Sequence, residues 1–191
     1  MNVLFGCASV QEDGSNLPVQ LRRRAERIGS APERAGLLAS YRQLELMLKR
    51  ASTGACHSLS RRGAYYAVAV SDFGAVGVDI ERIICSADLA AVAECYFPEG
   101  VRRYFNRLSV SDQPQFFASC WSALEAVSKL YSIPLEQAAS SLPEAVIYQC
   151  RVQEDMVLSV ALEQNDRLHL CGLAGETLQL ARSTFNFTVY P

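Results

Sequence analysis

The spacing of apolar residues along the chain predicts two long helices. Apolar positions three or four residues apart run from 31 to about 50, and Ser30 followed by Ala-Pro-Glu is typical of a helix N-terminus. The same spacing runs from 113 to 131 and includes Trp121 and Leu124. Weaker helical patterns cover three further segments, namely 18–28, 86–96 and 99–107.

Short apolar segments rich in β-branched and aromatic residues predict strands. The first covers 2–9, and the segments 64–70 and 75–80 flank a Ser-Asp-Phe-Gly turn, so 64–82 is predicted to be a β-hairpin. Strand-like segments also follow the long helix, at 146–152, 156–162, 167–173 and 184–190. Because strands and helices come in groups and do not alternate one by one, the order predicts the α+β class.

Composition narrows the functional classes. The 191 residues are 50% hydrophobic and 20% charged, with a formal net charge of −2, which is typical of a soluble globular protein and gives no reason to expect nucleic-acid or membrane partners. No apolar run approaches the roughly 20 residues of a membrane-spanning helix. Seven scattered cysteines without a C-x-x-C pair argue against disulfides and zinc, so we expect a cytoplasmic protein.

Positive charge is nevertheless concentrated in the first third of the chain. Two interpretations fit this concentration: a solvated helix face, or a surface that meets an anionic ligand. The residues concerned are Arg22, Arg23, Arg24, Arg27, Arg34, Arg42, Lys49, Arg50, Arg61 and Arg62.

Two acidic residues stand two positions apart in a predicted strand. Asp79 and Glu81 therefore lie on the same face of that strand. Neighbouring like charges are unfavourable unless a cation compensates them, and magnesium prefers oxygen ligands. A pair of solvated carboxylates near a strand end is the simpler interpretation of this motif taken alone.

One aromatic and two charged side chains lie on one face of the predicted long helix. Trp121, Glu125 and Lys129 are spaced four residues apart, so they line up on one face. An ordinary Glu to Lys ion pair at the helix surface explains the last two residues when they are considered alone.

The two motifs together resemble the signature segments of Sfp-type 4'-phosphopantetheinyl transferases. VGVDIE at 76–81 is similar to the family's G-(V/I)-D-(I/V)-E strand, and WSALEAVSK at 121–129 is similar to its W-(S/T)-x-K-E-(A/S)-x-x-K helix. Asp79 and Glu125 are 46 residues apart, within the family's usual forty to fifty. The resemblance extends over roughly 30–175.

This resemblance implies both a fold and an activity. The fold would be a single unit over 1–191 with two pseudo-twofold-related α/β halves, approximately 1–83 and 84–191. The activity would be the magnesium-dependent transfer of 4'-phosphopantetheine from coenzyme A to a serine of an acyl or peptidyl carrier protein, in fatty acid, polyketide or nonribosomal peptide biosynthesis. A monomer is expected, because both halves lie in one chain.

The resemblance also assigns roles to individual residues. It makes Asp79, Glu81 and Glu125 the magnesium ligands, with Glu125 also the general base. It places Lys129 on the pyrophosphate of coenzyme A. The remaining cofactor-binding residues are Arg34 for the nucleotide phosphate, and Ser60 and Arg61 for the adenosine 3'-phosphate.

The chain departs from the family pattern at three points. Leu124 replaces the first motif lysine, Arg61 replaces a histidine, and the usual G-K-P segment is not visible. A guanidinium still binds phosphate, so the second change preserves that function. The departures leave two hypotheses: an active transferase, or a catalytically impaired relative that binds coenzyme A or a carrier protein as an accessory.

Other candidate sites are weaker. Cys56 beside His57 suggests a thiol nucleophile, but adjacent strand side chains point to opposite faces. His57 and His169 are far apart in the sequence, so a histidine-based site is not expected. The glycines at 172–175 lack the strand, G-x-G-x-x-G and helix context of a dinucleotide site.

Overall fold

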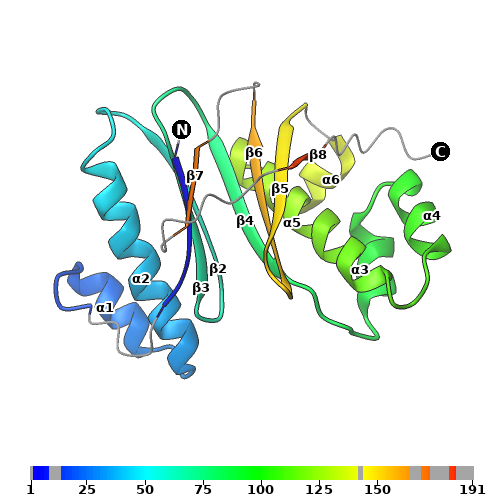
Figure 1. Ribbon diagram of the computed structural model, residues 1–191, viewed down its shortest axis with the longest axis horizontal. Helices are drawn as coiled ribbons and strands as arrows, with labels where there is room; N and C mark the ends of the chain where they lie inside the picture. Colours follow the sequence, from blue (N-terminus) through cyan, green and yellow to red (C-terminus); the bar gives the residue numbers. More distant parts are fainter. Residues whose placement is uncertain (1, 9–13, 142–143, 164–168, 173–180, 184–191) are drawn as a thin grey trace.

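Two four-stranded sheets stand side by side between two long helices in the computed structural model (Figure 1). The structure describes residues 2–8, 14–141, 144–163, 169–172 and 181–183. The α+β class predicted from the sequence is confirmed. None of the helices in these ranges is long and apolar enough to cross a membrane.

The first sheet has the strand order β2-β3-β1-β7. Strand β1 pairs antiparallel with β3 and parallel with β7, while β2 and β3 form an antiparallel hairpin. These strands are β1 (Asn2–Cys7), β2 (Cys56–Arg62), β3 (Tyr65–Ser71) and β7 (His169–Gly172).

The second sheet has the order β4-β6-β5-β8 and is antiparallel throughout. Apolar side chains from both sheets, including Phe5, Ala67, Val78 and Leu158, form one buried cluster, so the two sheets share a core. The strands are β4 (Val76–Arg82), β5 (Val146–Gln153), β6 (Met156–Leu162) and β8 (Ala181–Ser183).

Each sheet is covered by one long helix. The α2 side chains Ala35 and Ala39 pack against Val68 of the first sheet, whereas Val127 of α5 packs against Ile147 of the second. The described helices are α1 (Val19–Glu26), α2 (Ala31–Leu48), α3 (Leu89–Tyr96), α4 (Glu99–Arg107), α5 (Gln113–Tyr131) and α6 (Leu135–Ser141). Helices α3 and α4 form a separate cluster against the first turns of α5.

The predicted hairpin over 64–82 is wrong. Its two strands exist, as β3 and β4, but β3 pairs with β1 and β2, while β4 pairs with β6. The actual hairpin joins β2 to β3 through a turn at Gly63, whose φ of 61° favours glycine. The pattern of residues therefore identified the strands but not their partners.

The C-terminal strands were predicted only in part. Strands β5 and β6 agree with the prediction, and β7 lies within the predicted 167–173, whereas the predicted strand over 184–190 lies outside the described residues. Helix α6 was not predicted. Because β4 belongs to the second sheet and β7 to the first, a boundary at 83 does not coincide with the division between the sheets.

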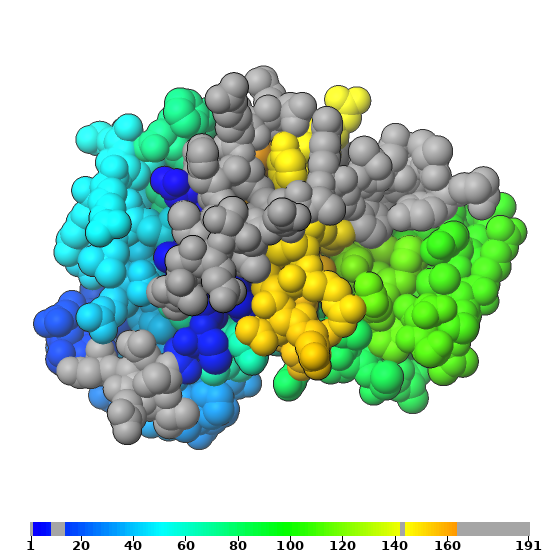
Figure 2. Space-filling view, viewed as in Figure 1, coloured from blue at the N-terminus to red at the C-terminus, as the bar shows by residue number. Residues whose placement is uncertain are grey.

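The two sheets meet where the edge strands β2 and β4 lie against each other. The Val78 N–H donates a 3.0 Å hydrogen bond to the Ser58 hydroxyl, so a side chain of one sheet satisfies the backbone of the other. Figure 2 shows the outer surface formed by β5 and β6, in yellow, between the N-terminal elements and the green helices α3 and α4.

Candidate functional site

Asp79 lies at the junction of the two sheets and is almost fully buried, with 2% of its surface exposed. Its Oδ1 accepts hydrogen bonds from Lys129 Nζ and Ser60 Oγ, each at 2.7 Å. Its Oδ2 is buried and has no hydrogen-bond partner among the residues that the structure describes. A buried carboxylate oxygen without a partner is costly, so this atom is free to bind a cation or a donor from a ligand.

Glu81 lies two residues further along β4, with its side chain 12% exposed. Arg62 of β2 places its Nε 3.0 Å from Glu81 Oε1, and the Arg82 N–H donates to the same oxygen at 2.7 Å. Burial raises the pKa of Glu81 against the opposing effects of the Arg82 hydrogen bond and the Arg62 charge, and Asp79 raises it further. The carboxylate therefore stands in an environment that favours added positive charge.

Glu125 approaches the strand carboxylates from α5. Trp121 Nε1 donates a 2.9 Å hydrogen bond to Glu125 Oε1, and Lys129 Nζ lies 3.7 Å from Oε2. Burial, followed by the nearby Asp79 carboxylate, raises the pKa of Glu125 to about 7, with Lys129 opposing the shift. The side chain is 33% exposed, so it remains accessible to a ligand.

Lys129 connects α5 to β4. Besides bonding Asp79, its ammonium donates to the Val78 carbonyl at 3.2 Å. The helix comes this close because Gly77 has no side chain: a Cβ there would lie 1.8 Å from the Ala126 carbonyl oxygen. The glycine of the GVDIE motif thus allows the α5 carboxylate and ammonium to reach β4.

A polar cavity of about 430 Å³ opens beside Lys129 and is called the arginine cavity below. Burial lowers the pKa of Arg61 and the charge of Arg24 lowers it further, while Tyr41 and Glu33 oppose the shift. Two arginines and a lysine along one cavity are typical of a surface that receives an anion. The cavity is lined by Ile28, Glu33, Leu59, Ser60, Arg61, Arg62, Gly63, Glu125 and Lys129.

Arg34 does not itself line this cavity, although it contacts Ile28, which does. Its guanidinium donates a 3.2 Å hydrogen bond to the Ile28 carbonyl and is exposed. Ser60 does line the cavity, although its hydroxyl donates to Asp79. The predicted phosphate-binding roles of Arg34 and Ser60 therefore stay predictions.

The side chain of Leu124 faces away from the site. It is 1% exposed and packs with Val127, Leu130 and Ile147 between α5 and the second sheet. At the position of the family's first motif lysine, this chain therefore has a leucine that packs in the core.

The donor atoms suit magnesium, although the described ranges contain no group of three or more His, Cys, Asp and Glu side chains already arranged around one metal position. The fit rests on chemistry: the buried Asp79 Oδ2, which has no hydrogen-bond partner among the described residues, belongs to a carboxylate that, together with burial, raises the pKa of Glu81 and of Glu125. In this structure Lys129 pairs with Asp79 and Arg62 pairs with Glu81, so these two cations supply part of the positive charge that the carboxylates require.

Two site residues were missed from the sequence. Arg62 was noted only as part of a basic group, yet it contacts Glu81 and lines the arginine cavity. Trp121 was placed on the same stripe as Glu125, but its hydrogen bond to that carboxylate was not predicted. The i to i+4 spacing was the available signal. Cys56 and His57, the alternative nucleophile pair, are exposed on β2 and do not line the cavity.

Comparison with known proteins identifies the family. A model of the 4'-phosphopantetheinyl transferase superfamily matches residues 75–173, just over half of the chain and the part that carries Asp79, Glu81, Glu125 and Lys129. No curated protein gave a significant match. The family predicted from the two motifs is confirmed, and the chain belongs to the 4'-phosphopantetheinyl transferase superfamily.

Proposed function

We propose that this protein transfers 4'-phosphopantetheine from coenzyme A to a serine of an acyl or peptidyl carrier protein. One observation carries the proposal: Asp79 and Glu81 on β4 lie beside Glu125 and Lys129 on α5, and these last two residues line a cavity that Arg61 and Arg62 also line. Superfamily membership supports phosphopantetheine transfer in general, and this site supports the details.

The reaction requires one bond to form and one to break. The carrier serine oxygen bonds to the β-phosphorus of coenzyme A, the bond from that phosphorus to the oxygen of the adenosine 5'-phosphate breaks, and adenosine 3',5'-bisphosphate leaves. The serine proton passes to Glu125. The Glu125 side chain is 33% exposed, so the carrier serine can approach it.

The cations of the arginine cavity would hold the phosphates. Lys129 lies next to the carboxylates and would contact the pyrophosphate, while Arg61 would bind the adenosine 3'-phosphate. Ser60 and Arg34 remain part of the proposal as further phosphate ligands. Lys129 and Arg62 would then exchange some carboxylate contacts for phosphate contacts when the ligand enters.

Asp79, Glu81 and Glu125 would hold magnesium, and Asp79 Oδ2 is the oxygen that has no hydrogen-bond partner among the described residues. When bound, the metal neutralises the negative charge of the pyrophosphate and of the leaving group. The protein's own contribution is to position the phosphates against Lys129 and to accept the serine proton at Glu125.

We also propose that the chain forms one unit with two related halves. Each half would consist of one sheet and its covering helix, with α2 on the first sheet and α5 on the second (Figure 1). The site would lie at the junction between these halves, where β2 faces β4. The same arrangement supports a monomer, since both sides of the site come from one chain.

A second candidate is a non-catalytic accessory protein that binds coenzyme A or a carrier. The observation that favours it is the pairing of the carboxylates with protein cations: Lys129 with Asp79, and Arg62 with Glu81. These ion pairs let the site exist without a metal. An accessory protein would bind coenzyme A or the carrier protein but would leave the carrier's serine unmodified.

Variants of the carboxylates separate these two candidates. We expect Asp79→Asn and Glu125→Gln each to reduce transfer to an apo carrier protein by at least about 100-fold, in the range typical of lost proton transfer or charge stabilisation. Glu99→Gln, an exposed carboxylate on α4, is the matched control and should transfer at the wild-type rate. Wild-type activity in both site variants would refute the assignment of the site.

A further inference from the structure

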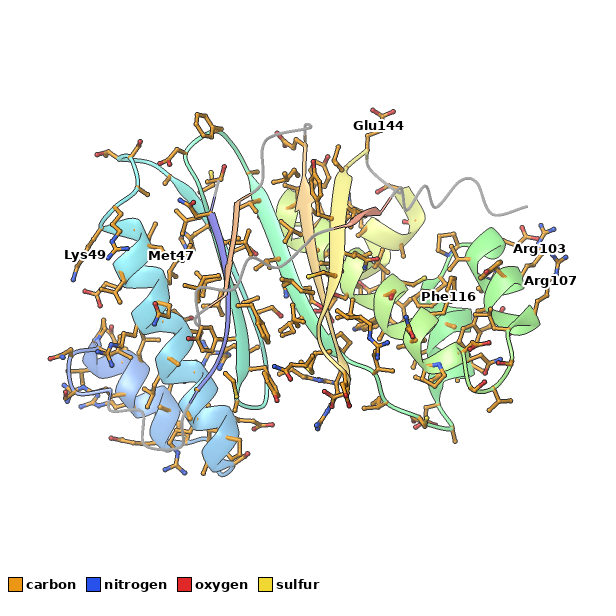
Figure 3. The ribbon with its side chains drawn as sticks, in the orientation of Figure 1. Met47, Lys49, Arg103, Arg107, Phe116 and Glu144 are labelled. Carbon is orange, nitrogen blue, oxygen red and sulfur yellow. The ribbon has the colours of Figure 1, made fainter. Side chains whose placement is uncertain are left out.

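Two serines of β2 form hydrogen bonds across the junction of the sheets to β4. Side chains fill the space between the two sheets (Figure 3). Ser58 and Ser60 are two positions apart on β2, so they share a face, and both are buried, with 8% and 7% of their surface exposed. Ser58 accepts a hydrogen bond from the main-chain N–H of Val78. Ser60 instead donates to the side chain of Asp79, so one serine holds the strand and the other holds a carboxylate.

The hydrogen bond from Ser60 determines which oxygen of Asp79 is left for a ligand. Oδ1 accepts from two donors on different elements, Ser60 Oγ on β2 and Lys129 Nζ on α5, each at 2.7 Å. Oδ2 is buried, and none of the described residues donates a hydrogen bond to it. Because one oxygen is held from two sides, the carboxylate is fixed in orientation, and Oδ2 is the atom that can bind a cation.

The two donors to Oδ1 differ in how they respond to a bound ligand. The Lys129 ammonium opposes a cation at Asp79 through its charge, its side chain is 32% exposed, and in the proposed function it also contacts the pyrophosphate. The Ser60 hydroxyl is neutral and buried, so it neither repels a cation nor needs to leave Oδ1. Ser60 is therefore the donor that can keep Asp79 in place once the site is loaded.

We infer that Ser60 is a positioning residue, whose hydroxyl holds Asp79 Oδ1 so that Oδ2 stays available to magnesium. The inference rests on the proposed function. A hydroxyl has one proton to donate, so the hydroxyl of Ser60 cannot donate to Asp79 and to a phosphate at the same time. Any phosphate contact of Ser60 would then have to come from its main chain.

Metal affinity provides the first test. Manganese, which carboxylates accept as they do magnesium, is titrated into each protein with coenzyme A and without carrier, and the free ion is followed by electron paramagnetic resonance. Ser60→Ala should weaken manganese binding by about tenfold or more, as is usual when a metal-binding group loses its hydrogen-bond partner. Ser60→Thr keeps the hydroxyl and should bind manganese as wild type does.

Ser58→Ala is the matched control. It removes the other hydrogen bond between the same two strands without touching the Asp79 carboxylate, so it should lower the melting temperature but leave manganese affinity unchanged. Ser60→Cys, which is similar in size but a weak donor, repeats the test if Ser60→Ala melts too early. Wild-type manganese affinity in Ser60→Ala would overturn the inference. Equal weakening by the two alanine variants would overturn it too, because that result would mean a general loosening of the junction.

Nucleotide affinity provides the second test. Dephospho-coenzyme A keeps the pyrophosphate but lacks the 3'-phosphate, and its affinity is compared with that of coenzyme A by calorimetry in magnesium. If the hydroxyl positions Asp79, Ser60→Ala lowers both affinities by the same factor and leaves their ratio at the wild-type value. A selective loss of affinity for coenzyme A would place the hydroxyl on the 3'-phosphate and overturn the inference.

Binding by wild type separates a failure of this inference from a failure of the proposed function. If wild type binds manganese and coenzyme A, and Ser60→Ala matches it in manganese affinity, only the role of Ser60 is refuted. If wild type binds neither, the proposed function is refuted and the role of Ser60 with it.

Discussion

Gly77→Ala tests how α5 and β4 build the site. A Cβ at position 77 would lie 1.8 Å from the Ala126 carbonyl oxygen and 2.7 Å from the Leu130 nitrogen, both of which are backbone atoms. Since such contacts essentially never fall below 3.0 Å, the helix and strand must separate locally by at least the difference between 3.0 and 1.8 Å, about 1.2 Å.

This separation would act directly on the site, because α5 carries Glu125 and Lys129. The 2.7 Å hydrogen bond from Lys129 to Asp79 would lengthen toward 4 Å and be lost. Overpacking of this kind costs about 1–3 kcal/mol, which lowers the melting temperature by roughly 2–12 °C in a chain of this length. A displacement of about 1 Å at a reacting group reduces the rate by about 100-fold.

The assay compares Gly77→Ala with Gly29→Ala, a change at a glycine that has nothing within 4 Å of its added Cβ. Melting is followed first, and transfer to a carrier is then measured well below the melting temperature. We expect loss of both stability and rate in Gly77→Ala and neither in Gly29→Ala. Wild-type stability and rate in Gly77→Ala would show that α5 does not approach β4 as closely as described.

Three further predictions concern single groups. Leu124→Lys should not increase activity, and the burial of an ammonium in the core should cost about 3–5 kcal/mol and lower the melting temperature by at least about 6 °C. The control Leu124→Met should change the melting temperature little. Higher activity in the lysine variant would contradict the core position of this residue. The pKa of Glu125 is raised from its usual 4.5 to about 7, so its contribution to stability is fully present below pH 4.5 and is lost as the pH rises through 7. Without magnesium, the melting temperature should therefore fall over this pH window more in wild type than in Glu125→Gln, and parallel melting profiles of the two would contradict the shift. Magnesium binding at pH 6 should release protons, which calorimetry detects. Trp121→Phe keeps an aromatic ring against Phe117 but loses the hydrogen bond to Glu125, so kcat should fall about tenfold or more with little change in melting temperature. An unchanged kcat would mean that Trp121 contributes packing alone and that its hydrogen bond does not affect the rate.

The local elements of the fold were predictable because their patterns are local. Helix α5 occupies the predicted 113–131, and the i to i+4 spacing placed Trp121, Glu125 and Lys129 on one stripe, which the structure bears out through the contacts among them. Strand β4 likewise shows Asp79 and Glu81 both buried beside partners from β2. Periodicity is sufficient where a helix or strand face determines the arrangement.

Strand partners and side-chain environments were less predictable. A turn at 71–74 between two apolar segments suggests a hairpin, yet β3 is completed by β1 and β2, and the next strand starts a new sheet. The sequence around Leu124 shows only that a lysine is missing, whereas the packing of α5 on the second sheet shows that the position is in the core. Long-range pairing of this kind depends on the whole chain.

The most direct test of the central claim is the intact mass of apo carrier proteins after incubation with this protein, coenzyme A and magnesium. A carrier that gains the mass of one phosphopantetheine, with adenosine 3',5'-bisphosphate formed in equal amount, is the predicted result. No mass gain on any carrier in a panel that an active transferase modifies fully would contradict the claim and favour the accessory-protein alternative.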